Sequence, residues 1–115
     1  MNYSNNIFTK FIENPDLVPW IINSQHSMAF HDKFPKADLH ILVIPKGHYR
    51  DMADFLLNSS SEEQLDFNNT IKEIIIKFQL EEKGFNIKIN NRESHGQEIF
   101  HFHLHIMSMT SSISI

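Results

Sequence analysis

The chain has 115 residues, of which 41% are hydrophobic and 21% charged, and this length and composition fit one globular domain. The formal net charge of −4 argues against a general nucleic-acid-binding surface, which would be basic, although backbone N–H groups can still bind a small phosphate ligand. There is no cysteine, so disulfides and thiolate metal sites are excluded; we also find neither a secretory signal nor an apolar run approaching about 18 residues, and expect a cytoplasmic protein with no membrane partner.

The first half of the sequence predicts a short helix followed by strands. Apolar residues within 7–13 follow helical spacing, Ser4 can cap this helix, and Asn14-Pro15 ends it. Short strands are expected at 18–22, 27–30 and 39–44. The last of these, LHILVI, is the most β-like run in the chain, and Pro-Lys-Gly closes it.

The second half predicts helices and then strands. Residues 52–58 favour one or two helical turns, and a capping box at Ser61 and Gln64 opens a long amphipathic helix that Gly84 ends. Period-two patterning at 85–89 indicates a strand, and 97–107 is expected to form the last strand. We therefore predict an α+β fold in a single domain over 1–115, with a core at about 7–107 and a short tail at 108–115.

The stretch HFHLHIM places histidine at three alternating positions, 101, 103 and 105. Side chains alternate faces along a strand, so the three imidazoles should share one face, while Phe102, Leu104 and their neighbours should pack on the long helix. Imidazole changes charge near neutral pH and also binds metals. The stretch is therefore the candidate functional site.

Three interpretations of these histidines remain open. They can decorate the polar face of an exposed strand, or two of them can ligate Zn²⁺ with a carboxylate from Asp32 or Glu98. Alternatively, one neutral imidazole attacks an electrophile while its neighbours orient it and carry protons. Three residues spaced along one strand converge poorly on a single ion, so the spacing favours the catalytic interpretation.

These residues resemble the signature of the HIT (histidine triad) family, in which three histidines alternate with hydrophobic residues. The resemblance extends to IFTKFIE at 7–13, to MAFHDKFPKADLHILVIPKGH at 28–48, and to GQEIFHFHLHIM at 96–107. The chain looks most similar to the branch of histidine triad nucleotide-binding proteins. That likeness implies a meander-like antiparallel sheet of about five strands with two main helices, and a homodimer that joins two sheets.

For chemistry, the resemblance implies hydrolysis or transfer at the α-phosphate of a purine nucleotide derivative, such as a nucleoside phosphoramidate or an acyl-nucleotide. His103 would attack and form a nucleotidyl-histidine, which water then hydrolyses. His105 would donate a proton to the leaving group. His101 and His40 would set the orientation and tautomer of the nucleophile.

The same resemblance implies the substrate contacts. Asp32 would accept hydrogen bonds from the ribose hydroxyls, and Asn90 would bind on the phosphate side. Loop donors at Gly96, Gln97 and Glu98 would cradle the α-phosphate oxygens. The base pocket would be lined by apolar side chains, namely Ile7, Phe8, Phe11 and Phe30, although Phe11 fits a purely structural place in the core equally well.

One residue departs from the family pattern. Glu98 stands where related proteins carry Ser or Thr, and a carboxylate repels an anionic phosphate, so either Glu98 turns away or the leaving group differs. No cofactor is expected to be required, and a bound zinc ion would not be catalytic. The alternatives are a dinucleoside polyphosphate hydrolase and a regulatory protein that binds nucleotide with little turnover.

Overall fold

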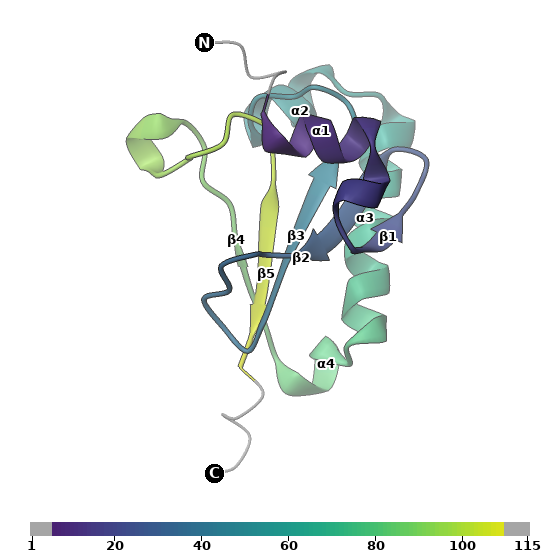
Figure 1. Ribbon diagram of the computed structural model, residues 1–115, viewed down its shortest axis with the longest axis vertical. Helices are drawn as coiled ribbons and strands as arrows, with labels where there is room; N and C mark the ends of the chain where they lie inside the picture. Colours follow the sequence, from purple (N-terminus) through teal and green to yellow (C-terminus); the bar gives the residue numbers. More distant parts are fainter. Residues whose placement is uncertain (1–5, 110–115) are drawn as a thin grey trace.

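The protein is described by a computed structural model over residues 6–109, in which helices cover both faces of a five-stranded antiparallel sheet (Figure 1). The strand order is β1-β2-β3-β5-β4, so the last strand of the chain inserts between β3 and β4. The predicted α+β class is confirmed, but the meander holds only for the first three strands. The strands are β1 Trp20–Asn23, β2 Ser27–His31, β3 Leu39–Pro45, β4 Asn86–Lys88 and β5 Leu104–Ser108.

The helices follow the predicted order with two local differences. Helix α1 (Ile7–Glu13) is capped by Asn6, whose side chain accepts from the Thr9 N–H; Ser4, the predicted cap, lies outside the described residues. Helix α2 (Met52–Asn58) begins after Asp51, whose carboxylate accepts from the Asp54 N–H. Short 3₁₀ turns occupy Pro15–Leu17 and Glu93–His95.

The long helix starts and ends differently from the prediction. Its capping box is formed by Ser60 and Glu63, one residue earlier than expected, because Ser60 takes the extended conformation that a cap requires. Helix α3 (Ser61–Lys77) then stops where Gln79 adopts a left-handed φ of 56°, and α4 (Leu80–Lys83) follows as a separate turn. Gly84 therefore ends α4 and not α3.

The two faces of the sheet carry separate hydrophobic cores. On one face, Phe67 and Ile74 of α3 pack with sheet residues that include Val43, Leu104 and Ile106, so the predicted contact between the last strand and the long helix is confirmed. On the other face, Phe8 of α1 packs with residues of β2 and β3, namely Met28, Phe30, Leu42 and Ile44. The second face also carries His40 and His105, because residues on one strand share a face at period two.

The last strand is shorter than predicted. Ladder pairing begins only at Leu104, and residues 97–103 form bends that leave the sheet. The Phe102 N–H donates to the Tyr49 carbonyl at 2.7 Å instead of joining a strand ladder. The alternating pattern of the sequence therefore crosses from irregular backbone into a strand. Within residues 6–109, no helix is long and apolar enough to cross a membrane.

Candidate active site

His101 lies inside the molecule and does not share an open face with the other two histidines, contrary to the expectation from alternation. Its side chain is fully buried, and Nε2 donates to the Pro45 carbonyl at 2.8 Å. Its Nδ1 is buried with no hydrogen-bond partner among the described residues. Burial lowers the pKa of His101 to about 4, so this imidazole is neutral at neutral pH and serves as an anchor.

His103 is fixed in one tautomer by the backbone of His101. Its Nδ1 lies 2.8 Å from the His101 carbonyl oxygen, and a carbonyl only accepts, so Nδ1 must carry the proton. Nε2 then holds a lone pair, and it has no hydrogen-bond partner among residues 6–109. Burial lowers the pKa of His103, an effect opposed by this hydrogen bond and by Asp32 and Glu98. The result is a neutral imidazole with its nucleophilic nitrogen available.

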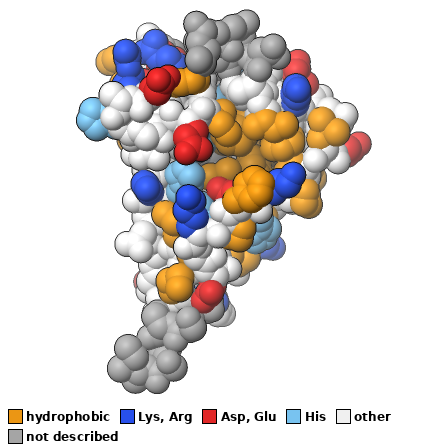
Figure 2. All heavy atoms as spheres, turned by 60° about the vertical axis from the view of Figure 1, so that its left-hand side comes forward, with side chains coloured by type: hydrophobic (Ala, Val, Ile, Leu, Met, Phe, Trp, Pro, Cys, Tyr) orange, Lys and Arg blue, Asp and Glu red, His pale blue; other side chains and the backbone are white. Residues whose placement is uncertain are grey.

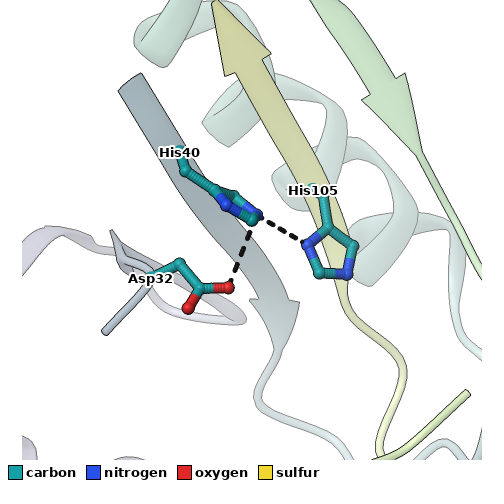
Figure 3. A group of neighbouring side chains, drawn as sticks. All are labelled: Asp32, His40 and His105. Atoms are coloured by element: carbon teal, nitrogen blue, oxygen red, sulfur yellow. Dashed lines mark hydrogen bonds and ion pairs between the residues drawn. The ribbon is translucent and has the colours of Figure 1, made fainter. Parts of the chain in front are cut away.

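His40 and His105 form a second histidine unit on neighbouring strands (Figure 3). The Lys36 backbone N–H donates to His40 Nδ1 at 3.0 Å, so the proton of His40 must sit on Nε2. That Nε2–H points at His105 Nδ1, 2.8 Å away, and Nδ1 must accept. The proton of neutral His105 is therefore on Nε2. One backbone amide thus sets the tautomers of two rings in series.

Asp32 is the third member of this group. Its Oδ2 lies 3.4 Å from His40 Nε2, and its Oδ1 accepts from the Phe34 N–H at 2.8 Å. Burial lowers the pKa of His40, and Asp32 opposes the shift. Burial, with contributions from His103 and His40, lowers the pKa of His105 to about 4. Hence both rings are neutral near pH 7, and the carboxylate lies where it can stabilise positive charge on either.

Asp32, His40 and His105 also have the spacing of a metal site, with one ligand atom from each lying within 4.8 Å of the others. Metal ligation by His40 Nε2 would need a lone pair on that nitrogen. The Lys36 N–H already donates to the lone pair of Nδ1. Freeing Nε2 for a metal would move the proton of His40 to Nδ1, where it would face the Lys36 N–H and the hydrogen bond would be lost. The hydrogen-bond pattern therefore favours a histidine pair over a metal centre.

The loop that precedes the histidines is held by Gln97. This side chain is 3% exposed; its amide nitrogen donates to the carbonyls of Arg50 and Ile99, and its oxygen accepts from the Arg92 N–H. The backbone N–H groups of Gly96 and Gln97 donate to the carbonyls of Glu93 and Arg92.

These hydrogen bonds change the expected phosphate cradle. Because the N–H groups of Gly96 and Gln97 already have partners, they are not free to hold phosphate oxygens in this arrangement. Glu98 is exposed, and its N–H has no acceptor among the described residues. Asn90 packs against Gly96, with its Cγ 3.6 Å from the place a Cβ would occupy. The three side-chain hydrogen bonds of Gln97 hold the loop before the histidines in place, a role that its sequence context did not indicate.

The four predicted apolar pocket residues lie near the histidines but differ in exposure. Phe8 and Phe30 are buried, with ring centroids 5.7 Å apart, and Phe11 packs edge-on against Phe30 at 5.4 Å. Phe8 also contacts the His103 ring edge-on, with centroids 5.1 Å apart. Ile7 is 44% exposed. Phe8 therefore links the core beneath α1 to His103, whereas Ile7 is the one of these four residues that faces solvent substantially.

The arrangement as a whole places a neutral His103 imidazole, with a lone pair on Nε2, beside the hydrogen-bonded His40–His105 pair on an α+β sheet. The HIT domain family model matches residues 13–112, and the chain therefore belongs to the HIT domain family. The resemblance identified from the histidine stretch is confirmed.

Relatives and solved structures agree with this assignment. A HIT-like protein of Rickettsia prowazekii is 37% identical over 102 residues, which cover 89% of this chain and 85% of the relative. A HIT family hydrolase from Clostridium thermocellum is 25% identical with a TM-score of 0.80, covering 90% of both chains. A histidine triad nucleotide-binding protein from Candida albicans is 26% identical with a TM-score of 0.78, covering 90% of this chain and 73% of that one.

Proposed function

We propose that this protein hydrolyses purine nucleotide derivatives at the α-phosphate, with nucleoside phosphoramidates or acyl-nucleotides as substrates, through a covalent intermediate on His103. One observation carries the proposal: the Nδ1–H of His103 is held by the His101 carbonyl, so Nε2 keeps a lone pair with no partner among residues 6–109. The likeness to solved proteins named hydrolase and nucleotide-binding protein supports both the reaction class and the ligand.

In the first step, His103 Nε2 forms a bond to phosphorus while the bond from phosphorus to the leaving group breaks. The leaving atom keeps the bonding electrons and takes a proton from His105 Nε2. The His40–His105 pair, which is neutral at rest, binds that proton from solvent before the step, with the Asp32 carboxylate beside it, so the pair returns to its neutral state and no imidazolate forms. In the second step, water adds to phosphorus, gives a proton to that same nitrogen, and displaces His103. The net products are a nucleoside monophosphate and the protonated leaving group.

Asp32 would serve two groups in this scheme. Its carboxylate lies beside His40 Nε2 and would stabilise charge that develops on the His40–His105 pair. Its remaining acceptor capacity would bind the ribose hydroxyls, as the family resemblance implies. No metal is required for either step, because a histidine supplies the nucleophile and another the proton.

The test is to trap the intermediate. Mixing the protein with an adenosine 5′-phosphoramidate, quenching rapidly and digesting should give one peptide carrying added nucleotide on His103. His103→Ala should lower turnover by more than about 10³-fold while leaving nucleotide affinity within a few-fold. His95→Ala, which changes an exposed histidine, is the matched control. Absence of turnover by the wild type on every nucleotide substrate would refute the hydrolase proposal.

We also propose that two chains pair through the β4 edge. All three residues of β4 are exposed, and β4 ends the sheet order. An open strand edge is a ready template for pairing with a second chain. Sedimentation equilibrium should give twice the chain mass; a monomer at micromolar concentration would contradict it.

A further inference from the structure

Lys88 faces the candidate active site from the edge strand. It is the direct cross-strand partner of His105 in the β4–β5 ladder, and partners in an antiparallel ladder project on the same face. Its neighbour Ile89 packs into the α3 core on the opposite face, which agrees with this orientation. The ammonium group therefore belongs to the surface around His105, and Lys88 is among the charges that act on the pKa of that ring.

Lys36 brings a second cation to the same pair of rings. Its backbone N–H is fixed on His40 Nδ1, and its side chain is exposed. Its charge acts on His40, as that of Lys88 acts on His105. Neither lysine has an ion-pair partner within residues 6–109. Two cations with no ion pair of their own thus lie near the His40–His105 pair, in addition to the Asp32 carboxylate that contacts His40.

The charges around the nucleophile have the opposite sign. His103 is influenced by Asp32 and Glu98, and no lysine or arginine acts on it in the described part of the chain. Figure 2 shows a face on which Lys or Arg and Asp or Glu side chains both lie beside a histidine, with hydrophobic side chains gathered next to them. Asp32 also acts on His40 and His105, so the feature that distinguishes the His40–His105 side of the site is the presence of the two lysines.

We propose that Lys36 and Lys88 are specificity-determining residues that favour substrates whose leaving group carries a negative charge. The inference rests on the proposed function, in which the leaving atom receives its proton at His105 and the leaving group must therefore lie close to Lys88. A carboxylate or phosphate on that group would be attracted by both ammonium groups, and a cationic group repelled.

The expected effect is moderate because both lysines are exposed and water screens them. An exposed ion pair changes an equilibrium or a rate by about two- to fivefold. With two lysines acting on one group, an anionic leaving group should exceed a neutral one of the same size by about five- to twentyfold in kcat/KM. The preference should shrink in 0.5 M NaCl, where the screening length falls to about 4 Å.

The experiment uses adenosine 5′-phosphoramidates of three small amines, glycine, glycinamide and ethylenediamine, whose leaving groups are anionic, neutral and cationic. Comparing each ratio between variants and the wild type removes the difference in amine basicity. The wild type should prefer them in that order by kcat/KM. Lys88→Gln and Lys36→Gln should each reduce the glycine-to-glycinamide ratio about two- to fivefold, and the double variant should bring it close to one. Lys88→Arg should retain the preference. Lys77→Gln, an exposed lysine at the end of α3, is the matched control and should change nothing.

The outcomes separate the two proposals. Turnover of all three compounds with a ratio near one in the wild type, or a ratio unchanged in the double variant, would overturn the charge selection and leave the hydrolase function standing. No turnover of any compound, together with no adduct on His103, would overturn both. A double variant that loses activity equally on all three compounds would show a structural role for the lysines and also overturn the selection.

Discussion

The two halves of the histidine stretch are built by different means. From Leu104 onward, each residue has a partner in β3 or β4, so His105 is placed by ladder register against Leu42 and Lys88. Before Leu104 there is no ladder, and each histidine is placed by a hydrogen bond from its own ring to a backbone carbonyl, His101 to Pro45 and His103 to His101. One regular sequence pattern is thus held in place by a β-ladder in its second half and by single side-chain hydrogen bonds in its first half.

The two halves therefore differ in how far the position of each histidine depends on a single contact. A β-ladder holds its strand through many backbone hydrogen bonds, so His105 keeps its position when one contact is lost. The irregular half depends on a few specific bonds, and each of them also fixes a tautomer. His103, the proposed nucleophile, therefore lies where its orientation depends on a few hydrogen bonds with no alternative support. Four predictions test this contrast.

The largest effect on stability is expected in the strand half. Ile106 is fully buried against α3, and Ile106→Ala should lower the free energy of unfolding by about 2–5 kcal/mol through lost apolar contact and a cavity. Turnover per folded molecule should stay within about threefold, since register still places His105. Ile76→Ala, at a residue 68% exposed on α3, should cost less than about 0.5 kcal/mol. Urea unfolding measures the change in stability, and kcat/KM measures turnover. If Ile106→Ala lost more than about threefold in turnover per folded molecule, the contrast between the two halves would be contradicted.

In the irregular half, a substitution should reduce turnover more strongly than it reduces stability. Gln97→Ala leaves the carbonyls of Arg50 and Ile99 and the Arg92 N–H without partners, at a cost of about 1–3 kcal/mol in unfolding free energy. Because this loop leads directly into the bend that holds His103, kcat should fall by about 10- to 100-fold. Gln64→Ala removes amide hydrogen bonds on the helix surface and is the matched control. Equal activity of the two variants would remove Gln97 from the positioning role.

Acid should weaken the anchor. The pKa of buried His101 is about 4, below its ordinary value, so below about pH 6.5 the unfolded chain binds a proton that the folded protein refuses. Stability is therefore fully present at neutral pH and is lost as pH falls from about 6.5 towards 4, by about 1–2 kcal/mol at pH 5. Urea unfolding at pH 7.5 and 5.0 measures the loss. His101→Asn should reduce the loss between pH 7.5 and 5.0 by the share of one histidine, because His105, whose pKa is also lowered to about 4, still contributes. An unchanged slope in that variant would assign the dependence to other groups.

Removal of metal should have the smallest effect. If the His40–His105 pair acts through its hydrogen bond, excess EDTA should leave kcat/KM within about twofold, because no ligand atom is needed from Nε2 of His40. Elemental analysis of the same sample gives the metal content. Activity that disappears with EDTA and returns with Zn²⁺ would place an ion between Asp32, His40 and His105 and would reverse the proposed tautomers.

Sequence patterning found the site because its chemistry is concentrated in a few residue types. The alternating histidines, Asp32 and His40 are all identifiable from the chain, and the structure brings Asp32, His40 and His105 together. Patterning could not find Pro45 or Lys36 as partners, since a backbone carbonyl or amide is available at almost every residue. Nor could it find Lys88, whose place beside His105 follows from strand register alone.

The sequence by itself determined the α+β class, most element positions and the family, because hydrophobic periodicity and the histidine motif are local in the chain. Only the tertiary structure decided that β5 begins at Leu104, that His101 is an anchor, and which nitrogen of each histidine carries the proton. The physical reason is that the protonation and orientation of an imidazole are set by hydrogen-bond partners 56 to 65 residues away or by the local bend of the backbone. The Pro45 carbonyl accepts from His101, and His40 Nε2 donates to His105. The sequence shows which side chains can react, and the folded structure determines the hydrogen-bond partner of each histidine ring.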